Sequence, residues 1–278
     1  MKTTKEFRFG ISSWSYPWSV GVAKGPQPKE KLSAAGLLEK AKQLDVKLVQ
    51  IADNLPLENL SSGQLNELRK KAQASGIALE IGTKGVEPDH VLRFLQIAQL
   101  FDSPVLRTLP AIFGKRVELD ELEQKLLAVL PDFETAGITL VLENQEAYRV
   151  AELADLMNKI NHPNLRICLD LANALGAMEG FQYTMQQLGP WCGNYHFKDV
   201  VIVRSKTLMG FSVEGRPSGQ GSLPLRWALD EIKKMHADNL PSVIIELWPT
   251  PLQTIEETIA LEEQWVAQSV EYMKTVSW

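Results

Sequence analysis

Short apolar segments alternate along the chain with longer stretches in which apolar residues recur at helical spacing. The apolar segments are rich in β-branched and aliphatic side chains, which is typical of buried strands. Eight such strands are predicted, at residues 8–14, 47–53, 77–83, 104–109, 138–144, 166–172, 194–200 and 242–248. Amphipathic stretches such as 61–76 and 119–137 lie between them and predict helices on the outside of a sheet.

Residues at the ends of the amphipathic stretches support this assignment. Ser61 and Gln64 have the spacing of a capping box, in which each side chain bonds the backbone of the other residue at a helix start. Gly76 and Gly137 each come directly before a predicted strand, where a glycine commonly ends a helix.

The repeated strand and helix units predict an α/β protein. No linker-like or low-complexity stretch interrupts the eight alternations, so we expect one (β/α)8 TIM barrel domain over residues 1–278. A doubly wound open sheet is the alternative. It is disfavoured because no G-x-G-x-x-G motif follows the first strand.

Two connections are too long to be simple links, residues 15–36 and residues 201–222. Long connections inside a compact domain are usually functional or disordered, and both of these carry aromatic and charged residues, unlike disordered tails. In a barrel, both would be loops over the C-terminal face, which is where active sites of this fold lie.

Polar side chains stand at the ends of four consecutive predicted strands. Glu143 ends the apolar run ITLVLE, Asp170 ends LRICLD, His196 lies in NYHFKD and Glu246 ends SVIIE. Burying an unpaired carboxylate costs several kcal/mol. Since consecutive strands of a barrel deliver these side chains to one place, a shared cation would offset that cost.

The predicted ligand set of Glu143, Asp170, His196 and Glu246 holds three carboxylates and one imidazole. Such an oxygen-rich set suits one divalent ion, with Mn²⁺ as the first choice, Mg²⁺ or Co²⁺ as alternatives and Zn²⁺ less favoured. A six-coordinate ion would leave two positions for substrate oxygens. For each residue alone, a helix cap or a solvated loop position is the ordinary explanation, and only the repetition favours a metal site.

Bulk composition narrows the range of partners. The net charge is −5, which argues against binding to a nucleic-acid backbone. No apolar run reaches the length of about 20 residues that spans a membrane, and the N-terminus lacks the apolar core of a signal peptide. The two cysteines lie in or beside apolar segments and are expected to be reduced. We therefore expect a cytoplasmic protein that acts on a small molecule.

Four cations accompany the predicted metal site: Lys84, Arg107, Lys198 and Arg216. They would either pair with the acids of the site or bind a carboxylate or phosphate of the substrate. Two aromatic residues are further candidates for substrate contact. Trp14 follows the first strand, and Trp248 lies two residues beyond Glu246 and faces the same way.

The motifs LENQE, CLDLAN, YHFKD, EGRPSGQGSL and IIELW resemble the xylose isomerase-like TIM barrel family, which includes sugar phosphate isomerases and ketose 3-epimerases. The resemblance covers nearly the whole chain. It implies that Glu143 and Glu246 act both as metal ligands and as the acid/base pair, and that Arg216 contacts the substrate. It also implies a homodimer or a homotetramer.

Two positions depart from the pattern of that family. Gln145 and Asn173 stand where relatives often carry a histidine soon after the strand-five glutamate and the strand-six aspartate. We keep Asn173 among the expected substrate-binding residues. The departures leave the identity of the substrate open.

Three functions follow from these residues. The leading hypothesis is a metal-dependent isomerase or epimerase of a small ketose or keto-sugar derivative, which works through a metal-stabilised enediolate. The second is a metal-dependent decarboxylase, or more broadly a lyase or dehydratase, of a keto sugar acid, in which the four cations bind the acid group. The third is a sugar-binding barrel without chemistry, which the presence of all four ligands disfavours.

Overall fold

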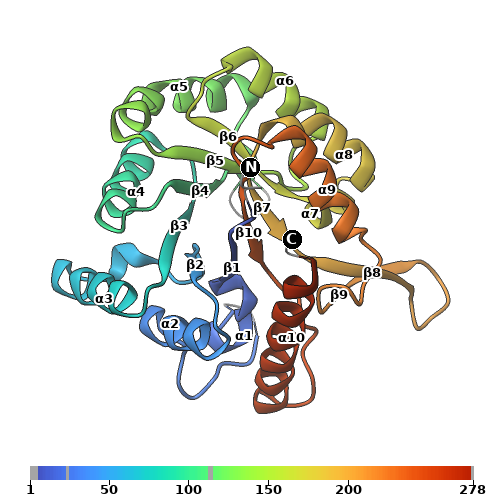
Figure 1. Ribbon diagram of the computed structural model, residues 1–278. Helices are drawn as coiled ribbons and strands as arrows, with labels where there is room; N and C mark the ends of the chain where they lie inside the picture. The colour runs from blue at the N-terminus through green and yellow to red at the C-terminus, as the bar shows by residue number, and fades with distance from the viewer. Residues whose placement is uncertain (1–5, 23–24, 112–114, 277–278) are drawn as a thin grey trace, which may run out of the picture.

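The computed structural model describes residues 6–22, 25–111 and 115–276. Within these residues, eight parallel strands close into a barrel in the order β1-β10-β7-β6-β5-β4-β3-β2 (Figure 1). The strands are β1 (Phe9–Ser12), β2 (Leu48–Ile51), β3 (Ala78–Lys84), β4 (Val105–Leu109), β5 (Thr139–Glu143), β6 (Leu165–Asp170), β7 (Cys192–Phe197) and β10 (Ser242–Ile245). The predicted (β/α)8 barrel is confirmed.

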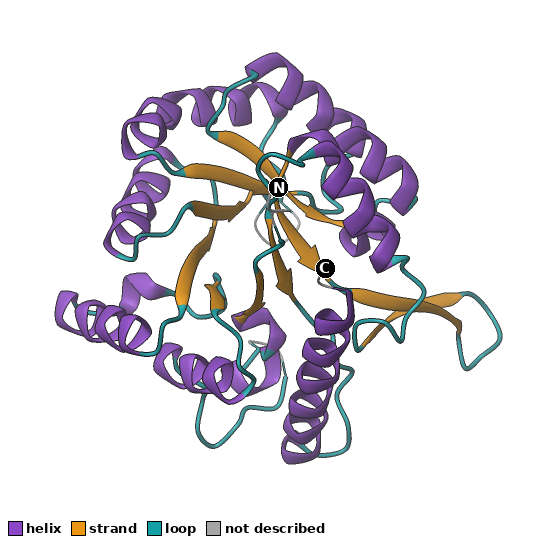
Figure 2. Ribbon diagram, viewed as in Figure 1, coloured by secondary structure: helices purple, strands orange, loops and turns teal. Residues whose placement is uncertain are grey.

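Helices surround the barrel on the outside, as Figure 2 shows. The long helices are α2 (Ala34–Gln43), α3 (Ser62–Ala74), α4 (Pro88–Leu100), α5 (Leu119–Ala136), α6 (Val150–Ile160), α8 (Phe181–Leu188), α9 (Leu225–Met235) and α10 (Ile255–Val276). Two shorter helices, α1 (Pro17–Val20) and α7 (Leu171–Gly176), follow β1 and β6. No helix among the described residues is both long and apolar enough to cross a membrane.

The local signals at helix ends take the form that the sequence predicts. Ser61 and Gln64 make both bonds of a capping box at the start of α3. Gly76 and Gly137 have φ angles of 62° and 65°, in the left-handed region that favours glycine, and each ends a helix just before a strand.

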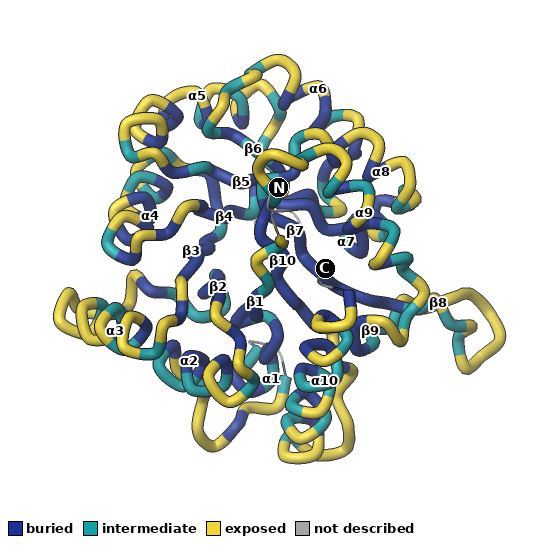
Figure 3. The backbone as a smooth tube through the Cα atoms, in the orientation of Figure 1, coloured by how far each residue is buried: buried dark blue, intermediate teal, exposed yellow. Residues whose placement is uncertain are grey.

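Alternation along the strands gives the barrel two different surfaces. In β5, Leu140 and Leu142 face outward and join the large apolar core beneath the helices. Val141 faces inward and belongs to a separate small cluster with Val105 and Cys168. Most residues of the eight barrel strands are buried, as the dark blue in Figure 3 shows. The polar inward residues are therefore enclosed by the barrel wall.

The expectation of a plain loop at 201–222 is wrong. The chain leaves β7 at Phe197 and forms an antiparallel hairpin of β8 (Asp199–Arg204) and β9 (Phe211–Arg216), which projects from the barrel (Figure 1). The predicted strand at 194–200 therefore spans two elements. Both hairpin strands contain β-branched or aromatic residues, which favour extended backbone, and the segment between them supplies the turn.

A buried carboxylate joins the last helix to the first loop. Glu262 of α10 is fully buried and accepts hydrogen bonds from the backbone N–H groups of Trp18 and Ser19 and from the Ser19 hydroxyl. Burial raises the pKa of Glu262 to about 7, although these donors partly oppose the shift.

This raised pKa predicts a pH-dependent stability. The native state holds the Glu262 proton more tightly than the unfolded chain does, so the free energy of unfolding should fall by about 1–3 kcal/mol as pH rises from about 4.5 to about 7. Denaturant titrations at a series of pH values should show this fall in the wild type and a flatter profile in Glu262→Gln. Glu263→Gln removes only a minor cause of the raised pKa, so it should keep most of the fall.

Candidate metal centre

The four predicted ligands stand at the C-terminal ends of neighbouring strands. Glu143 and Asp170 are the last residues of β5 and β6, His196 is the penultimate residue of β7, and Glu246 directly follows β10. In the barrel register, Asp170 lies beside His196 and His196 lies beside Ile244. All four side chains are buried.

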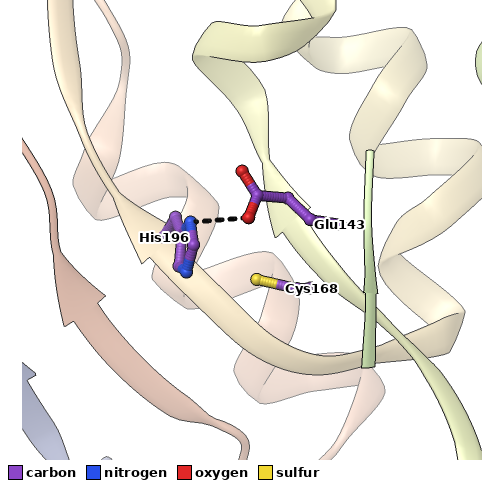
Figure 4. Close-up of side chains that lie close together, drawn as sticks. All are labelled: Glu143, Cys168 and His196. Atoms are coloured by element: carbon purple, nitrogen blue, oxygen red, sulfur yellow. Dashed lines mark ion pairs between the residues drawn. The ribbon is translucent and has the colours of Figure 1, made fainter. Parts of the chain in front are cut away.

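Their ligand atoms converge on one point inside the barrel. His196 Nδ1 lies 3.3 Å from an oxygen of Glu246, 3.6 Å from one of Glu143 and 4.0 Å from one of Asp170. One ligand atom from each residue can be chosen so that all four lie within 4.8 Å of one another. Figure 4 shows His196 and Glu143 facing each other across this space.

The hydrogen bond at Nε2 of His196 determines whether the other ring nitrogen, Nδ1, presents a proton or a lone pair to the carboxylates. The Nε2 atom lies 3.1 Å from Gln50 Oε1. The Gln50 amide nitrogen donates to Glu80 and Asn194, so its oxygen is the atom that faces the ring. Nε2 therefore carries a proton that it donates to Gln50, and this bond fixes the ring orientation.

The Nδ1 atom of His196 is buried and has no hydrogen-bond partner. A lone pair at this position would face three carboxylates, which is unfavourable unless a positive charge lies between them. Burial opposes the charged ring, but Cys168, Glu246 and Glu143 together raise the pKa of His196 well above its ordinary value. A proton or a divalent ion would supply the missing charge, so the donor set fits such an ion.

Two buried cations complete the cluster. Arg107 Nε lies 2.5 Å from Glu143, and its guanidinium also donates to Asp53 at 2.8 Å. Lys198 Nζ lies 2.6 Å from Asp170 and 3.2 Å from Glu246. The four carboxylates of the cluster, which are the three predicted ligands and Asp53, exceed the two buried cations by two negative charges, and the partly exposed Lys84, 3.9 Å from Asp53, offsets part of this excess. One divalent ion would neutralise this excess.

The cations also keep the glutamates ionised. Burial would raise the pKa of Glu143, but Arg107 and His196 outweigh it and lower the pKa to about 2. Burial is likewise outweighed at Glu246, where His196 and Lys198 hold the pKa far below its ordinary value.

Comparison with known proteins places this geometry in a family. The model for the xylose isomerase-like TIM barrel matches residues 38–276. The chain belongs to this family. A 3-oxo-isoapionate decarboxylase from Pectobacterium atrosepticum is 31% identical to this xylose isomerase-like barrel over 266 residues, which cover 96% of this chain and 94% of that protein. The expected family and the expectation of an enzyme are thereby confirmed.

Solved structures share the fold of this xylose isomerase-like barrel at lower identity. A D-psicose 3-epimerase structure has a TM-score of 0.70 and 17% identity, with 97% of this chain and 99% of that chain covered. A xylose isomerase-like barrel from Mycobacterium smegmatis in complex with magnesium has a TM-score of 0.68 and 14% identity, with 98% and 99% covered.

The structure brings most of the predicted substrate-binding residues to the mouth of the cluster. Asn173 donates to Glu143 at 2.9 Å, and the Trp14 indole donates to Asp53 at 3.1 Å. The Trp248 ring is partly exposed and lies 4.5 Å from Lys198 Nζ. Lys84 stands farther out, 3.9 Å from Asp53 and partly exposed.

Arg216 is placed differently from the other predicted substrate residues. It lies at the end of β9, and its guanidinium contacts Glu214 and the carbonyl oxygen of Gly215. Among the described residues, no hydrogen bond or ion pair joins it to the four ligands. Its contact with a substrate stays a prediction.

Sequence reasoning missed the residues that hold the ligands in place. The Asn144 side chain makes two hydrogen bonds with the backbone of Asp170. Its oxygen accepts from the Asp170 N–H at 2.7 Å, and its amide nitrogen donates to the Asp170 carbonyl oxygen at 2.8 Å. The Ser12 hydroxyl donates to Glu246 at 3.2 Å, and Asp53 holds Arg107. A polar residue inside a predicted apolar strand could have indicated such a supporting role, and Gln50 in KLVQIAD is the clearest example.

The bond from His196 to Gln50 predicts a loss of metal affinity when Gln50 is replaced by leucine. Leucine cannot accept the Nε2 proton, so the ring is free to turn and to protonate Nδ1 instead. Loss of such an outer partner typically weakens metal binding by about 10–100-fold. Mn²⁺ titration followed by electron paramagnetic resonance would measure this loss. Gln50→Glu restores the acceptor for Nε2 but removes the amide that donates to Glu80 and Asn194, so it should recover only part of the affinity.

Proposed function

We propose that this enzyme is a divalent-metal-dependent decarboxylase of a small 3-oxo sugar acid. The observation that carries the proposal is the pair of buried cations, Arg107 and Lys198, inside the predicted metal cluster. Arg107 is held by Glu143 and Asp53, whereas Lys198 would be freed from Asp170 and Glu246 by a bound ion. A buried ammonium at this place suits the carboxylate of a sugar acid better than a neutral sugar. Similarity to a 3-oxo-isoapionate decarboxylase over nearly the whole chain supports the same choice.

A divalent ion held by Glu143, Asp170, His196 and Glu246 would polarise the keto oxygen of the substrate and offset negative charge that develops there. Mn²⁺ is the ion that we expect, as argued from the ligand set. With the ion in place, the ammonium of Lys198 no longer has to neutralise Asp170 and Glu246 alone. Its charge is then directed to the acid group of the substrate.

Decarboxylation does not require a base to remove a proton from carbon. The bond between the acid carbon and its neighbour breaks, carbon dioxide leaves, and the bonding electrons move toward the keto oxygen. The neighbouring carbon then takes one proton from water. In this reaction, Lys198 binds and orients the acid group beside the indole of Trp248, which excludes water from one side.

The hydrogen bonds of Glu143 favour this reaction over epimerisation. An epimerase needs one carboxylate to remove a proton and another to return it. Both oxygens of Glu143 are already engaged, one with Arg107 and the other with Asn173. A carboxylate that accepts charged and amide donors on both oxygens is a weak base.

An isomerase or epimerase of a neutral ketose is the second candidate. Glu143 and Glu246 reach the site from two different strands, which is the arrangement that an acid/base pair requires. Fold similarity to a D-psicose 3-epimerase is consistent with this candidate.

One experiment separates the two candidates. The enzyme would be supplied with Mn²⁺ in D₂O together with a panel of 3-oxo sugar acids and ketoses, and a chelator-treated sample would serve as the control. We expect metal-dependent release of carbon dioxide and one deuterium in the resulting sugar. Metal-dependent deuterium exchange into a ketose, without carbon dioxide release from any acid, would favour the epimerase and overturn the decarboxylase.

A further inference from the structure

A cysteine lies inside the barrel next to the proposed metal centre. Cys168 precedes Asp170 by two residues on β6, so both side chains face inward. In the barrel register, Cys168 lies beside Glu143 on one side and Asn194 on the other. It is fully buried. Figure 4 shows its sulfur pointing into the space between Glu143 and His196.

Cys168 forms a second ligand set with two of the proposed ligands. Ligand atoms of Glu143, Cys168 and His196 lie within 4.8 Å of one another, and all three residues are buried. His196 Nδ1, the buried nitrogen without a hydrogen-bond partner, lies 3.6 Å from Glu143 and is open to an ion at either ligand set. The three donor types, carboxylate, thiol and imidazole, are all ligands of zinc-like ions.

We propose that thiophilic divalent ions such as Zn²⁺ and Cd²⁺ bind to Glu143, Cys168 and His196, as a site distinct from the four-residue set for Mn²⁺. The inference rests on the proposed function, because the two sets share Glu143 and His196. Ligand softness separates them. Mn²⁺ and Mg²⁺ prefer the three carboxylates, whereas Zn²⁺ and Cd²⁺ gain most from sulfur.

Burial raises the pKa of the Cys168 thiol to about 11, so the thiol holds its proton until a metal ion takes the place of that proton. Cys168 Sγ lies 3.2 Å from Asn194 Oδ1, to which it donates its proton. On binding, a metal–sulfur bond forms, the S–H bond breaks and the proton leaves to solvent, with no change in oxidation state. Asn194 Oδ1 still accepts the bond from the Gln50 amide, so the exchange leaves no buried oxygen unsatisfied.

The shared ligands make the two sites mutually exclusive. An ion bound through Cys168 uses Glu143 and His196, and it leaves Asp170 and Glu246 with Lys198, their partner in this structure. Lys198 then stays bound to the acids instead of the substrate. Zn²⁺ and Cd²⁺ should therefore compete with Mn²⁺ and inhibit the enzyme.

The test uses Cd²⁺ and the two cysteines of the chain as a matched pair. Cys192, on the neighbouring strand β7, is also buried, and its thiol donates to the backbone oxygen of Asn194. We expect a sulfur-to-cadmium charge-transfer band in the wild type and in Cys192→Ser, and none in Cys168→Ser. The affinity for Cd²⁺ should fall by about 100-fold or more in Cys168→Ser. An unchanged band in Cys168→Ser would overturn the inference.

A second measurement needs no variant. X-ray absorption of the Cd²⁺-loaded wild type should show one sulfur neighbour, and a shell of oxygen and nitrogen alone would overturn the inference. Mn²⁺ binding to the same preparation tests the proposed centre separately. Mn²⁺ binding without a Cd²⁺–sulfur bond would refute this site and leave the proposed function standing, whereas a Cd²⁺–sulfur bond without Mn²⁺ binding would support this site and count against the proposed function.

Discussion

Replacing Lys198 with methionine is expected to lower kcat/KM for a 3-oxo sugar acid by about 10²–10³-fold, which is the range typical for loss of a preorganised charged or polar group in an active site. Methionine keeps the length of the side chain and its contact with the Trp248 ring. It removes the ammonium that lies between Asp170 and Glu246. Carbon dioxide release at saturating Mn²⁺ would measure the effect.

The control for this substitution is Lys84→Met. Lys84 stands at the rim, partly exposed and 3.9 Å from Asp53, so its removal should cost less than tenfold. Mn²⁺ should bind at least as tightly to Lys198→Met as to the wild type, because a positive charge has been removed from beside the ion. Equal losses in the two variants would show that Lys198 has no special part in binding the acid group.

The parts of the site that the sequence revealed share one property. Glu143, Asp170 and Glu246 interrupt apolar runs at strand ends, where a carboxylate is out of place unless it has a partner. Strand order and the shared end of a parallel barrel then bring them together. The meeting of these three side chains could therefore be predicted from their positions at strand ends and from the barrel fold, without knowledge of any contact.

The parts that the sequence did not reveal depend on barrel closure. Gln50 and Glu80 lie within strands, and a polar residue at such a position looks like the solvent-facing side of an ordinary sheet. Only closure turns them into a buried network with Asn194. The interiors of such barrels are usually filled by branched apolar residues, so this network is an exception that composition cannot predict.

The β8–β9 hairpin was missed for a different reason. Among the residues that the structure describes, its two strands pair only with each other. Their alternation is weak because apolar residues occur on both faces. Aspartate, lysine and glycine residues around it gave the segment the composition of a loop.

The identity of the substrate stayed open as well, since Arg107 and Lys198 were equally consistent with pairing to the acids of the site. In the structure, Arg107 pairs with Glu143 and Lys198 pairs with Asp170. The carboxylates of the cluster still outnumber these two cations, and a divalent ion would neutralise the remaining negative charge.

Asp170→Asn is expected to weaken metal binding while the helix cap at this position is kept. One oxygen of Asp170 accepts hydrogen bonds from the backbone N–H groups of Ala172 and Asn173 and starts α7, while the other faces Lys198 and His196. Asparagine retains an oxygen for the helix and presents an NH₂ group to the metal side, which cannot ligate a cation. Lys198 loses one of its two acid partners and keeps Glu246, so thermal stability should fall but the fold should be retained.

Affinity for Mn²⁺ should fall by at least about 100-fold in Asp170→Asn, and decarboxylation by about 10³-fold, because the loss of a direct ligand exceeds the loss of an outer partner. Asp199→Asn provides the opposite case. Asp199 accepts four backbone N–H groups at the base of the β8–β9 hairpin and lies outside the predicted ligand set. Its replacement should lower stability and leave Mn²⁺ affinity intact. If Asp170→Asn bound Mn²⁺ as tightly as the wild type, the ion would have to be held elsewhere, and the four-residue centre would be wrong.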